Sequence, residues 1–129
     1  MIVADNSAIV AYLIWPEALP RFEEILQVKA IISAPDIIDF EFLSALRRME
    51  RHAEVTPVRA LEALSDFMSM PVSRYSISGL MNEIWELRHN FSAYDASYVA
   101  LARMLDVELV TRDGKLARAA EKLISVIHI

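Results

Sequence analysis

The chain has 129 residues, of which 55% are hydrophobic, and it carries a formal net charge of −5 at neutral pH. This length predicts a single domain over residues 1–129, and the longest apolar run, Ala8 to Trp15, is too short to span a membrane. The chain contains no cysteine, which excludes a disulfide framework and a thiolate metal site; we expect a soluble, cytoplasmic protein with no membrane association.

Short apolar runs alternate with longer segments of helical periodicity. The runs are typical of strands buried on both faces, and they cover Ile2 to Ala4, Ala30 to Ile32, Val107 to Val110 and Val126 to Ile129. Helix starts are indicated at Ser7, Asp36, Thr56 and Ser92, with a weaker one near Ser76 or Ser78. The stretch from Asp36 to about Gly79 predicts a helical hairpin with little strand. The alternation predicts a three-layer α/β fold around a mostly parallel central sheet.

Four acidic residues occupy special places on this scaffold. Asp5 ends the first strand, and Asp113 lies just past the end of another strand in LVTRD. The functional crevice of a parallel sheet lies beyond the carboxyl ends of its strands, so these two acids point to one edge. Asp95 shares a helix face with Val99 and so points toward packed protein, and Glu41 borders the apolar stripe of its own helix.

Each of the four acids also has a purely structural explanation. Asp5 is placed to cap the helix after it, and Asp95 follows Ser92 at the spacing of a capping box. Asp113 begins an ordinary turn pair with a glycine. Glu41 by itself is a border residue of an amphipathic helix, while Asp39 and Glu50 of the same helix turn to solvent. None of the four is specific when taken alone.

Taken together, the four acids indicate a metal site. Carboxylates gathered at one edge repel one another unless cations are present. Mg²⁺ or Mn²⁺, which prefer oxygen ligands, would resolve this conflict and would offset most of the net negative charge. Such a site activates water and hydrolyses phosphodiester bonds without a nucleophilic side chain. The residues therefore predict a metal-dependent nuclease, in which the ion helps an acidic protein to bind nucleic acid.

These residues resemble the PIN-domain ribonucleases, and within them the VapC-type toxins of bacterial toxin–antitoxin pairs. The resemblance spans essentially the whole chain and rests on IVADNSAIVAYL, APDIIDFEFLSALRR and LRHNFSAYDASYVALARMLDVELVTRDGKLARA. It implies a PIN-like fold and an endoribonuclease that uses Mg²⁺ or Mn²⁺. The implied metal ligands and catalytic residues are Asp5, Glu41, Asp95 and Asp113, supported by the hydroxyl groups of Ser7 and Thr111. The chain departs from the family at Asn6, so we expect the hydrogen bonding around Asp5 to differ.

The resemblance also implies partners. It predicts a homodimer and a cognate VapB-like antitoxin that wraps the helical hairpin and reaches the acidic site. We expect the RNA to be cut in single-stranded segments. Basic side chains near the proposed site are candidates for holding phosphates: Arg88, Arg112 and Lys115, with His89 and Arg118. The arginines at 47, 48 and 51 are expected to form a solvated helix face, and the three histidines lack metal-ligand spacing.

Two other classes of protein match part of this pattern. A phosphoacceptor domain also places acids at strand ends, but DNS lacks the second aspartate of the phosphatase pattern, and no lysine serves the receiver pattern. A degenerate PIN domain that binds RNA or protein without catalysis is the second alternative, and the presence of all four acids argues against it. Large apolar side chains indicate a dimer or partner interface, with core packing as the simpler explanation for most: Trp15, Phe42, Met49, Phe67, Met68, Met70 and Trp85.

Overall fold

The computed structural model describes residues 1–29 and 31–129. In this part of the chain, one sheet contains five strands in the order β3-β2-β1-β4-β5, and every pairing is parallel. The strands are β1 (Ile2–Ala4), β2 (Ile32–Pro35), β3 (Val72–Tyr75), β4 (Leu109–Thr111) and β5 (Val126–His128). The prediction of a three-layer α/β fold is confirmed.

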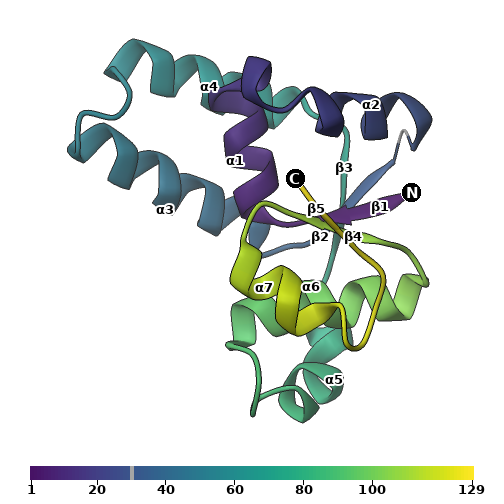
Figure 1. Ribbon diagram of the computed structural model, residues 1–129. Helices are drawn as coiled ribbons and strands as arrows, with labels where there is room; N and C mark the ends of the chain where they lie inside the picture. Colours follow the sequence, from purple (N-terminus) through teal and green to yellow (C-terminus); the bar gives the residue numbers. More distant parts are fainter. Residues whose placement is uncertain (30) are drawn as a thin grey trace.

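Helices cover both faces of this sheet (Figure 1). On one side lie α1 (Asn6–Ile14), α2 (Pro20–Val28), α3 (Ile38–Arg51) and α4 (Pro57–Ser69). On the other side lie α5 (Met81–Glu86), α6 (Ala93–Leu105) and α7 (Gly114–Ala120). Two short 3₁₀ turns, η1 (Pro16–Ala18) and η2 (Ile77–Leu80), precede α2 and α5. Helices α3 and α4 form the predicted hairpin, which projects beyond the sheet. None of the helices described is long and apolar enough to cross a membrane.

The order of the strands creates a crevice between β1 and β4. From β1 the chain builds outward through β2 to β3, and it then crosses back to add β4 and β5 on the other side of β1. The chain leaves β1 toward one side of the sheet and leaves β4 toward the other. The loops that follow these two neighbouring strands therefore separate, which opens a ligand site at the carboxyl ends of the strands. Asp5 follows β1 directly and Asp113 follows β4 by two residues, so the topology carries both acids to this crevice.

Some predicted strand boundaries differ from the structure. The second strand runs Ile32–Pro35 rather than from Ala30, and Ala30 itself lies outside the described residues. Ser33 in this strand has no exposed surface. Because serine is polar, the sequence did not indicate that this position is buried. Strand β3 was not predicted, because as an edge strand with the sequence VSRY it is only half-buried and lacks an apolar run. The last two predicted strands shift by one or two residues.

The predicted helix starts were right in two places, shifted by one residue at Ser7 and wrong at Asp36. The Thr56 and Ser92 side chains accept hydrogen bonds from the amides of Arg59 and Asp95, at 3.1 and 3.2 Å, as N-caps do. The start predicted at Ser7 differs by one residue, because α1 begins at Asn6 and is capped by Asp5, as the structural explanation of Asp5 had it. The prediction at Asp36 is wrong, since α3 begins at Ile38 without a side-chain cap. The weaker start near Ser76 corresponds to η2.

The core lies between the sheet and its helix layers. The buried stripe predicted for α3 is confirmed: Ile38, Phe42, Ala45, Leu46 and Met49. Phe42 stacks on Phe67 of α4 with ring centroids 4.1 Å apart, which fixes the hairpin. Of the large apolar residues considered for an interface, Phe42, Met49 and Phe67 are buried, whereas Trp15, Met68 and Trp85 are exposed. Core packing therefore accounts for part of that set only.

The end of α3 permits a test of local strain. Ala53 has a φ of 53°, and the Glu54 amide donates to the Met49 carbonyl at 2.8 Å, as in a Schellman motif that usually places glycine at this position. We expect Ala53→Gly to raise the free energy of unfolding by about 0.5 kcal/mol in urea denaturation, because glycine adopts this conformation without strain.

The matched control is Ala119→Gly inside α7, which should lower the free energy of unfolding by up to about 1 kcal/mol. If both substitutions destabilised the protein equally, the left-handed backbone at position 53 would carry no strain.

Candidate active site

A cleft of about 290 Å³ opens at the carboxyl ends of β1 and β4, beneath α3 and beside the first turn of α6. The structure brings all four predicted acids to its walls, and we call them the cleft acids: Asp5, Glu41, Asp95 and Asp113. Two acids of α3 stay outside the cleft. Asp39 pairs with Arg74 of β3 at 2.9 Å, and Glu50 is exposed. The four acids come from segments far apart in sequence, so only the fold can gather them.

Asp5 is the most buried of the cleft acids, with 5% of its surface exposed. Its Oδ1 accepts hydrogen bonds from the Ala8 amide at 3.0 Å and the Ser7 hydroxyl at 2.7 Å. Its Oδ2 accepts one from the Thr111 hydroxyl at 2.6 Å. Burial raises the pKa of Asp5 despite these hydrogen bonds, with a further contribution from the charge of Asp113. The residue therefore caps α1 and also presents a constrained carboxylate to the cleft.

The two hydroxyl groups join the ends of β1 and β4. The Arg112 amide donates to Ser7 Oγ at 2.9 Å, and the Asp113 amide donates to Thr111 Oγ1 at 3.0 Å. Each hydroxyl oxygen thus accepts a hydrogen bond from a backbone amide after β4, and each hydroxyl donates its single proton in a hydrogen bond to Asp5. This network ties Asp5 to the backbone that leads into Asp113. The catalytic supporting role that the family resemblance implies for Ser7 and Thr111 stays a prediction.

Glu41 is held by a residue that sequence reasoning missed. The Tyr98 hydroxyl of α6 donates a hydrogen bond to Glu41 Oε1 at 2.7 Å. Burial raises the pKa of Glu41, and repulsion from Asp5 and Asp95 adds to the shift. The pKa of Tyr98 is also raised, by burial and by the Glu41 charge, so the phenol keeps its proton and remains a donor. The available signal was its spacing, three residues after Asp95 on the same helix face.

Asp95 and Asp113 differ in what holds them. The Asp95 amide bonds to the Ser92 cap, and its half-buried carboxylate lines the cleft. Burial raises the pKa of Asp95, the Asp113 charge raises it further, and the Lys115 charge lowers it. Asp113 Oδ1 accepts hydrogen bonds from the amides of Lys115 and Leu116, at 2.8 and 3.1 Å, and so caps α7. Asp113 therefore caps a helix and also lines the cleft, as Asp5 does.

Mutual repulsion links the cleft acids in a closed ring. Asp5 is coupled to Asp113, Asp113 to Asp95, Asp95 to Glu41, and Glu41 back to Asp5. Within residues 1–29 and 31–129, no three acidic or histidine side chains form a ready-made ligand cage. The donor set consists of carboxylate oxygens, which suits a hard divalent cation, and a cation would relieve the repulsion around the ring. By donor chemistry and charge, these residues fit a divalent metal ion.

The raised pKa values predict how stability depends on pH without metal. Asp5, Glu41 and Asp95 bind protons more tightly in the folded state than in the unfolded state. The free energy of unfolding should therefore rise as the pH falls from neutral through the raised pKa values, until it reaches the ordinary carboxyl range. Urea denaturation in EDTA at neutral and mildly acidic pH measures this rise, which should be smaller in Asp95→Asn. An equal response in both proteins would mean that Asp95 is not part of the repulsive cluster.

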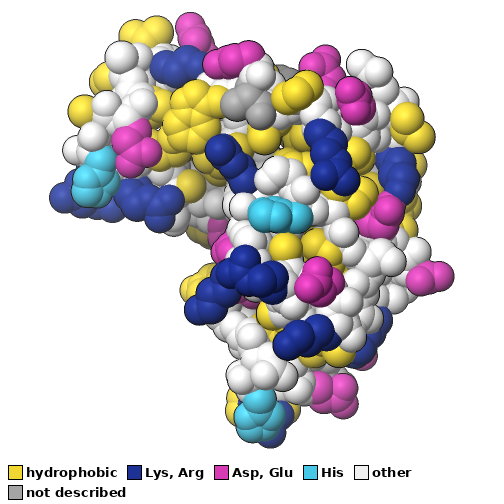
Figure 2. Space-filling model, viewed as in Figure 1, with side chains coloured by type: hydrophobic (Ala, Val, Ile, Leu, Met, Phe, Trp, Pro, Cys, Tyr) yellow, Lys and Arg dark blue, Asp and Glu magenta, His cyan; other side chains and the backbone are white. Residues whose placement is uncertain are grey.

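Basic side chains lie on both sides of the cleft. Arg48 of α3 and Arg112 after β4 line it, and the charge of Lys115 acts on Asp95. Figure 2 shows basic side chains on the α3 arm and on the helices facing it, with acidic side chains in the notch between them. Arg88 lies elsewhere: its guanidinium stacks over Trp85 at 4.5 Å. The α3 arginines are exposed as predicted, but the prediction overlooked that Arg48 also faces the cleft.

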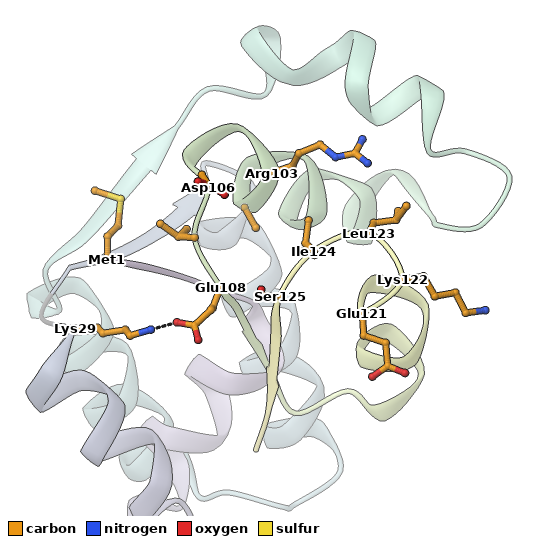
Figure 3. Close-up of a pocket in the computed structure, with 12 residues that line it drawn as sticks. Met1, Lys29, Arg103, Asp106, Glu108, Glu121, Lys122, Leu123, Ile124 and Ser125 are labelled. Atoms are coloured by element: carbon orange, nitrogen blue, oxygen red, sulfur yellow. Dashed lines mark ion pairs between the residues drawn. The ribbon is translucent and has the colours of Figure 1, made fainter.

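A larger hollow, of about 720 Å³, lies at the opposite edge of the sheet (Figure 3). Met1, Glu108 and Ser125 mark the amino ends of three strands there, and Lys29 forms an ion pair with Glu108. Three acidic and three basic side chains line it, so their charges offset one another. This hollow is larger than the cleft but is the weaker candidate for an active site. The excess of acidic over basic side chains that a metal ion requires is found in the smaller cleft.

The comparisons with known proteins agree with this geometry. A family model described as PIN domain matches residues 2–122. The chain belongs to the PIN-domain family. This PIN domain is 38% identical over 122 residues to Ribonuclease VapC9 of Mycobacterium tuberculosis, with 91% of the chain and 89% of the relative covered. It is 39% identical over 118 residues to Ribonuclease VapC1 of the same organism, with the same coverage. The resemblance to VapC-type ribonucleases is thus confirmed.

Solved structures show the same fold. The PIN domain superposes on PAE2754 from Pyrobaculum aerophilum with a TM-score of 0.69 and 19% identity, covering 97% of this chain and 81% of that one. It superposes on Mycobacterium tuberculosis VapC20, described as a sarcin-ricin loop cleaving toxin, with a TM-score of 0.64 and 20% identity, covering 92% and 95%. At these identities, the two structures support the fold alone.

Proposed function

We propose that this PIN domain is a metal-dependent endoribonuclease that hydrolyses RNA phosphodiester bonds and acts as the toxin of a type II toxin–antitoxin pair. The observation that carries the proposal is that the four cleft acids, from segments far apart in sequence, line one cleft at the crevice between β1 and β4. The VapC ribonucleases that match nine-tenths of the chain support the same activity.

The cleft acids would hold Mg²⁺ or Mn²⁺ and act as the catalytic residues: Asp5, Glu41, Asp95 and Asp113. A bound divalent ion would supply Lewis-acid chemistry, activating water and offsetting the charge that develops on the phosphate oxygens. The chain's own part is to preorganise the carboxylates. Ser7 and Thr111 orient Asp5, and the Tyr98 hydroxyl keeps Glu41 turned into the cleft.

Cations at the rim of the cleft would bind the RNA backbone on either side of the cut. Arg112 and Arg48 line the cleft and the charge of Lys115 acts on Asp95, so phosphates can be held while the scissile one enters the acidic cleft. A splayed single strand can present its phosphate to so narrow a cleft, whereas a rigid duplex cannot. Arg88 remains a candidate for more distant contacts.

The partners follow from the family and the surface. We propose a VapB-like antitoxin that covers the α3–α4 hairpin and the cleft, a homodimer, and action in the cytoplasm. The exposed apolar side chains on the described hairpin support a protein contact there: Leu43, Val58 and Leu61. A degenerate, non-catalytic PIN domain is less well supported, because all four acids and their supporting hydroxyls are in place.

The experiment incubates the purified protein with total RNA in Mg²⁺, in Mn²⁺ and in EDTA, and maps the 5′ ends that appear. We expect discrete new ends with either metal and none in EDTA. Cleavage that persisted in EDTA would overturn the metal-dependent mechanism. Binding without cleavage in any condition would favour the non-catalytic alternative.

A further inference from the structure

A second hollow, of about 370 Å³, opens beside the acidic cleft; we call it the side hollow. It shares four lining residues with the cleft, namely Asn6, Glu41, Ala45 and Arg48. Phe40 and Tyr94 belong to the side hollow and not to the cleft. Its volume falls in the range of about 300–1,000 Å³ that is usual for small-ligand sites. Because the two spaces share these walls, adjacent parts of one ligand can occupy both.

The two aromatic residues directly precede two of the cleft acids in sequence. Phe40 precedes Glu41 on α3, and Tyr94 precedes Asp95 on α6. Consecutive residues of an α-helix point about 100° apart, because the helix has 3.6 residues per turn. Each helix therefore turns a carboxylate into the cleft and an aromatic ring toward the side hollow.

Packing does not account for these aromatic rings. Phe40 is 77% exposed and Tyr94 is 62% exposed, so neither contributes much to the core. Exposed aromatic faces beside a basic track are the usual means of holding single-stranded nucleic acid, since each base can stack on a ring.

Arg48 connects the side hollow to the phosphate path. It lines the cleft, the side hollow and a third, smaller hollow that it shares with Arg47, Arg51 and His52. Carboxylates, aromatic rings and guanidinium groups thus line adjoining hollows of one surface. A nucleotide chain carries a base beside each phosphate, so it can contact a ring and a guanidinium group at neighbouring positions.

We propose that the side hollow holds one unpaired nucleobase of the RNA next to the phosphate that is cut, stacked against Phe40 and Tyr94, with Arg48 on the intervening backbone. This inference rests on the proposed endoribonuclease function and adds to it a base subsite. A base must leave a helix to enter the side hollow, so the subsite selects single-stranded segments at the cut.

The test uses a short RNA with one mapped cut site, and a series in which each nucleotide flanking the cut is replaced by an abasic one. For the parent protein, one abasic position should raise KM by roughly 5- to 100-fold, which is the range expected for one lost base stack. The double substitution Phe40→Ala with Tyr94→Ala should raise KM on the complete RNA by a similar factor. On the abasic RNA, the double variant should have nearly the same KM as the parent protein, because the base that would stack is already absent.

The matched control is Met68→Ala on α4, which is 75% exposed and lines neither the cleft nor the side hollow. It should leave KM and kcat unchanged. Phe40→Trp should restore binding, since a larger ring still stacks. All these side chains are exposed, so the melting temperatures should match that of the parent.

The outcomes separate this inference from the proposed function. If the parent protein cleaves no RNA, the proposed function fails first. If the parent cleaves but the double variant has the parental KM and the parental abasic penalty, the base subsite is wrong. If the variants cleave normally and instead lose a protein partner or dimerisation, the side hollow is a protein contact, and the inference is likewise overturned.

Discussion

Asp95→Asn should reduce RNA cleavage by at least about 10²- to 10³-fold and should abolish growth arrest when the protein is expressed alone. The substitution replaces one of the cleft carboxylates by a neutral amide, so it would weaken binding of the proposed metal ion, whose positive charge would stabilise the transition state. Asp95 suits this test because the hydrogen bond that caps α6 runs from its backbone amide to the Ser92 side chain, and asparagine keeps that amide. The cap survives in the variant. Initial rates on a defined RNA and a growth assay measure the effect.

Two further variants make this result specific. Asp5→Asn should lose as much activity, but it also weakens the hydrogen bonds from Ser7 and Thr111, so a loss of stability is expected with it. Glu50→Gln is the matched control, because Glu50 lies on α3 like Glu41 but is exposed and outside the cleft. It should change neither rate nor toxicity. A folded Asp95→Asn protein as toxic as the parent would contradict the nuclease mechanism and favour action by occlusion.

Millimolar Mg²⁺ or Mn²⁺ should raise the melting temperature of the metal-free protein by several degrees. An ion that binds only the folded state adds about 2.7 kcal/mol when present at 100 times its Kd, and a domain of this size responds by several degrees. The physical source is relief of repulsion among the cleft acids, whose burial raises the pKa values of Asp5, Glu41 and Asp95. Differential scanning fluorimetry with and without EDTA measures the shift.

Asp95→Asn should change the melting temperature differently in the absence and in the presence of metal. Without metal, Asp95→Asn should raise the melting temperature because it removes one repelling charge, and with metal it should gain less than the parent. Glu50→Gln should respond to metal as the parent does. KCl at matched ionic strength controls for general screening. An equal shift in KCl, or none with millimolar divalent ion, would count against the metal site. A large metal-free loss of stability in Asp95→Asn would instead favour a capping role for its carboxylate.

The sequence alone was sufficient for the fold class and for the prediction that the four acids come together. Buried parallel strands are short apolar runs, and helices show apolar residues at helical spacing, so both periods can be counted along the chain. Strand-end placement identified Asp5 and Asp113, because the residues just after a parallel strand lie at the crevice edge whatever the exact packing. Thr56 and Ser92 were predictable as caps, since capping is a local interaction within a few residues.

Only the tertiary structure decided the features that depend on distant segments meeting. The bond from Tyr98 to Glu41 joins α6 to α3, and edge strand β3 exists because β2 pairs with it, not because VSRY is apolar. The sequence predicted a solvated Arg48, but the fold places it on the wall of the cleft. Phe40 and Tyr94, which are far apart in sequence, line the same side hollow only in the folded chain. Local propensity acts over a few residues, whereas a site is made by contacts across the whole chain. The four acids could therefore be predicted from the sequence, whereas the residues that surround them and shift their pKa values are brought together only by the fold.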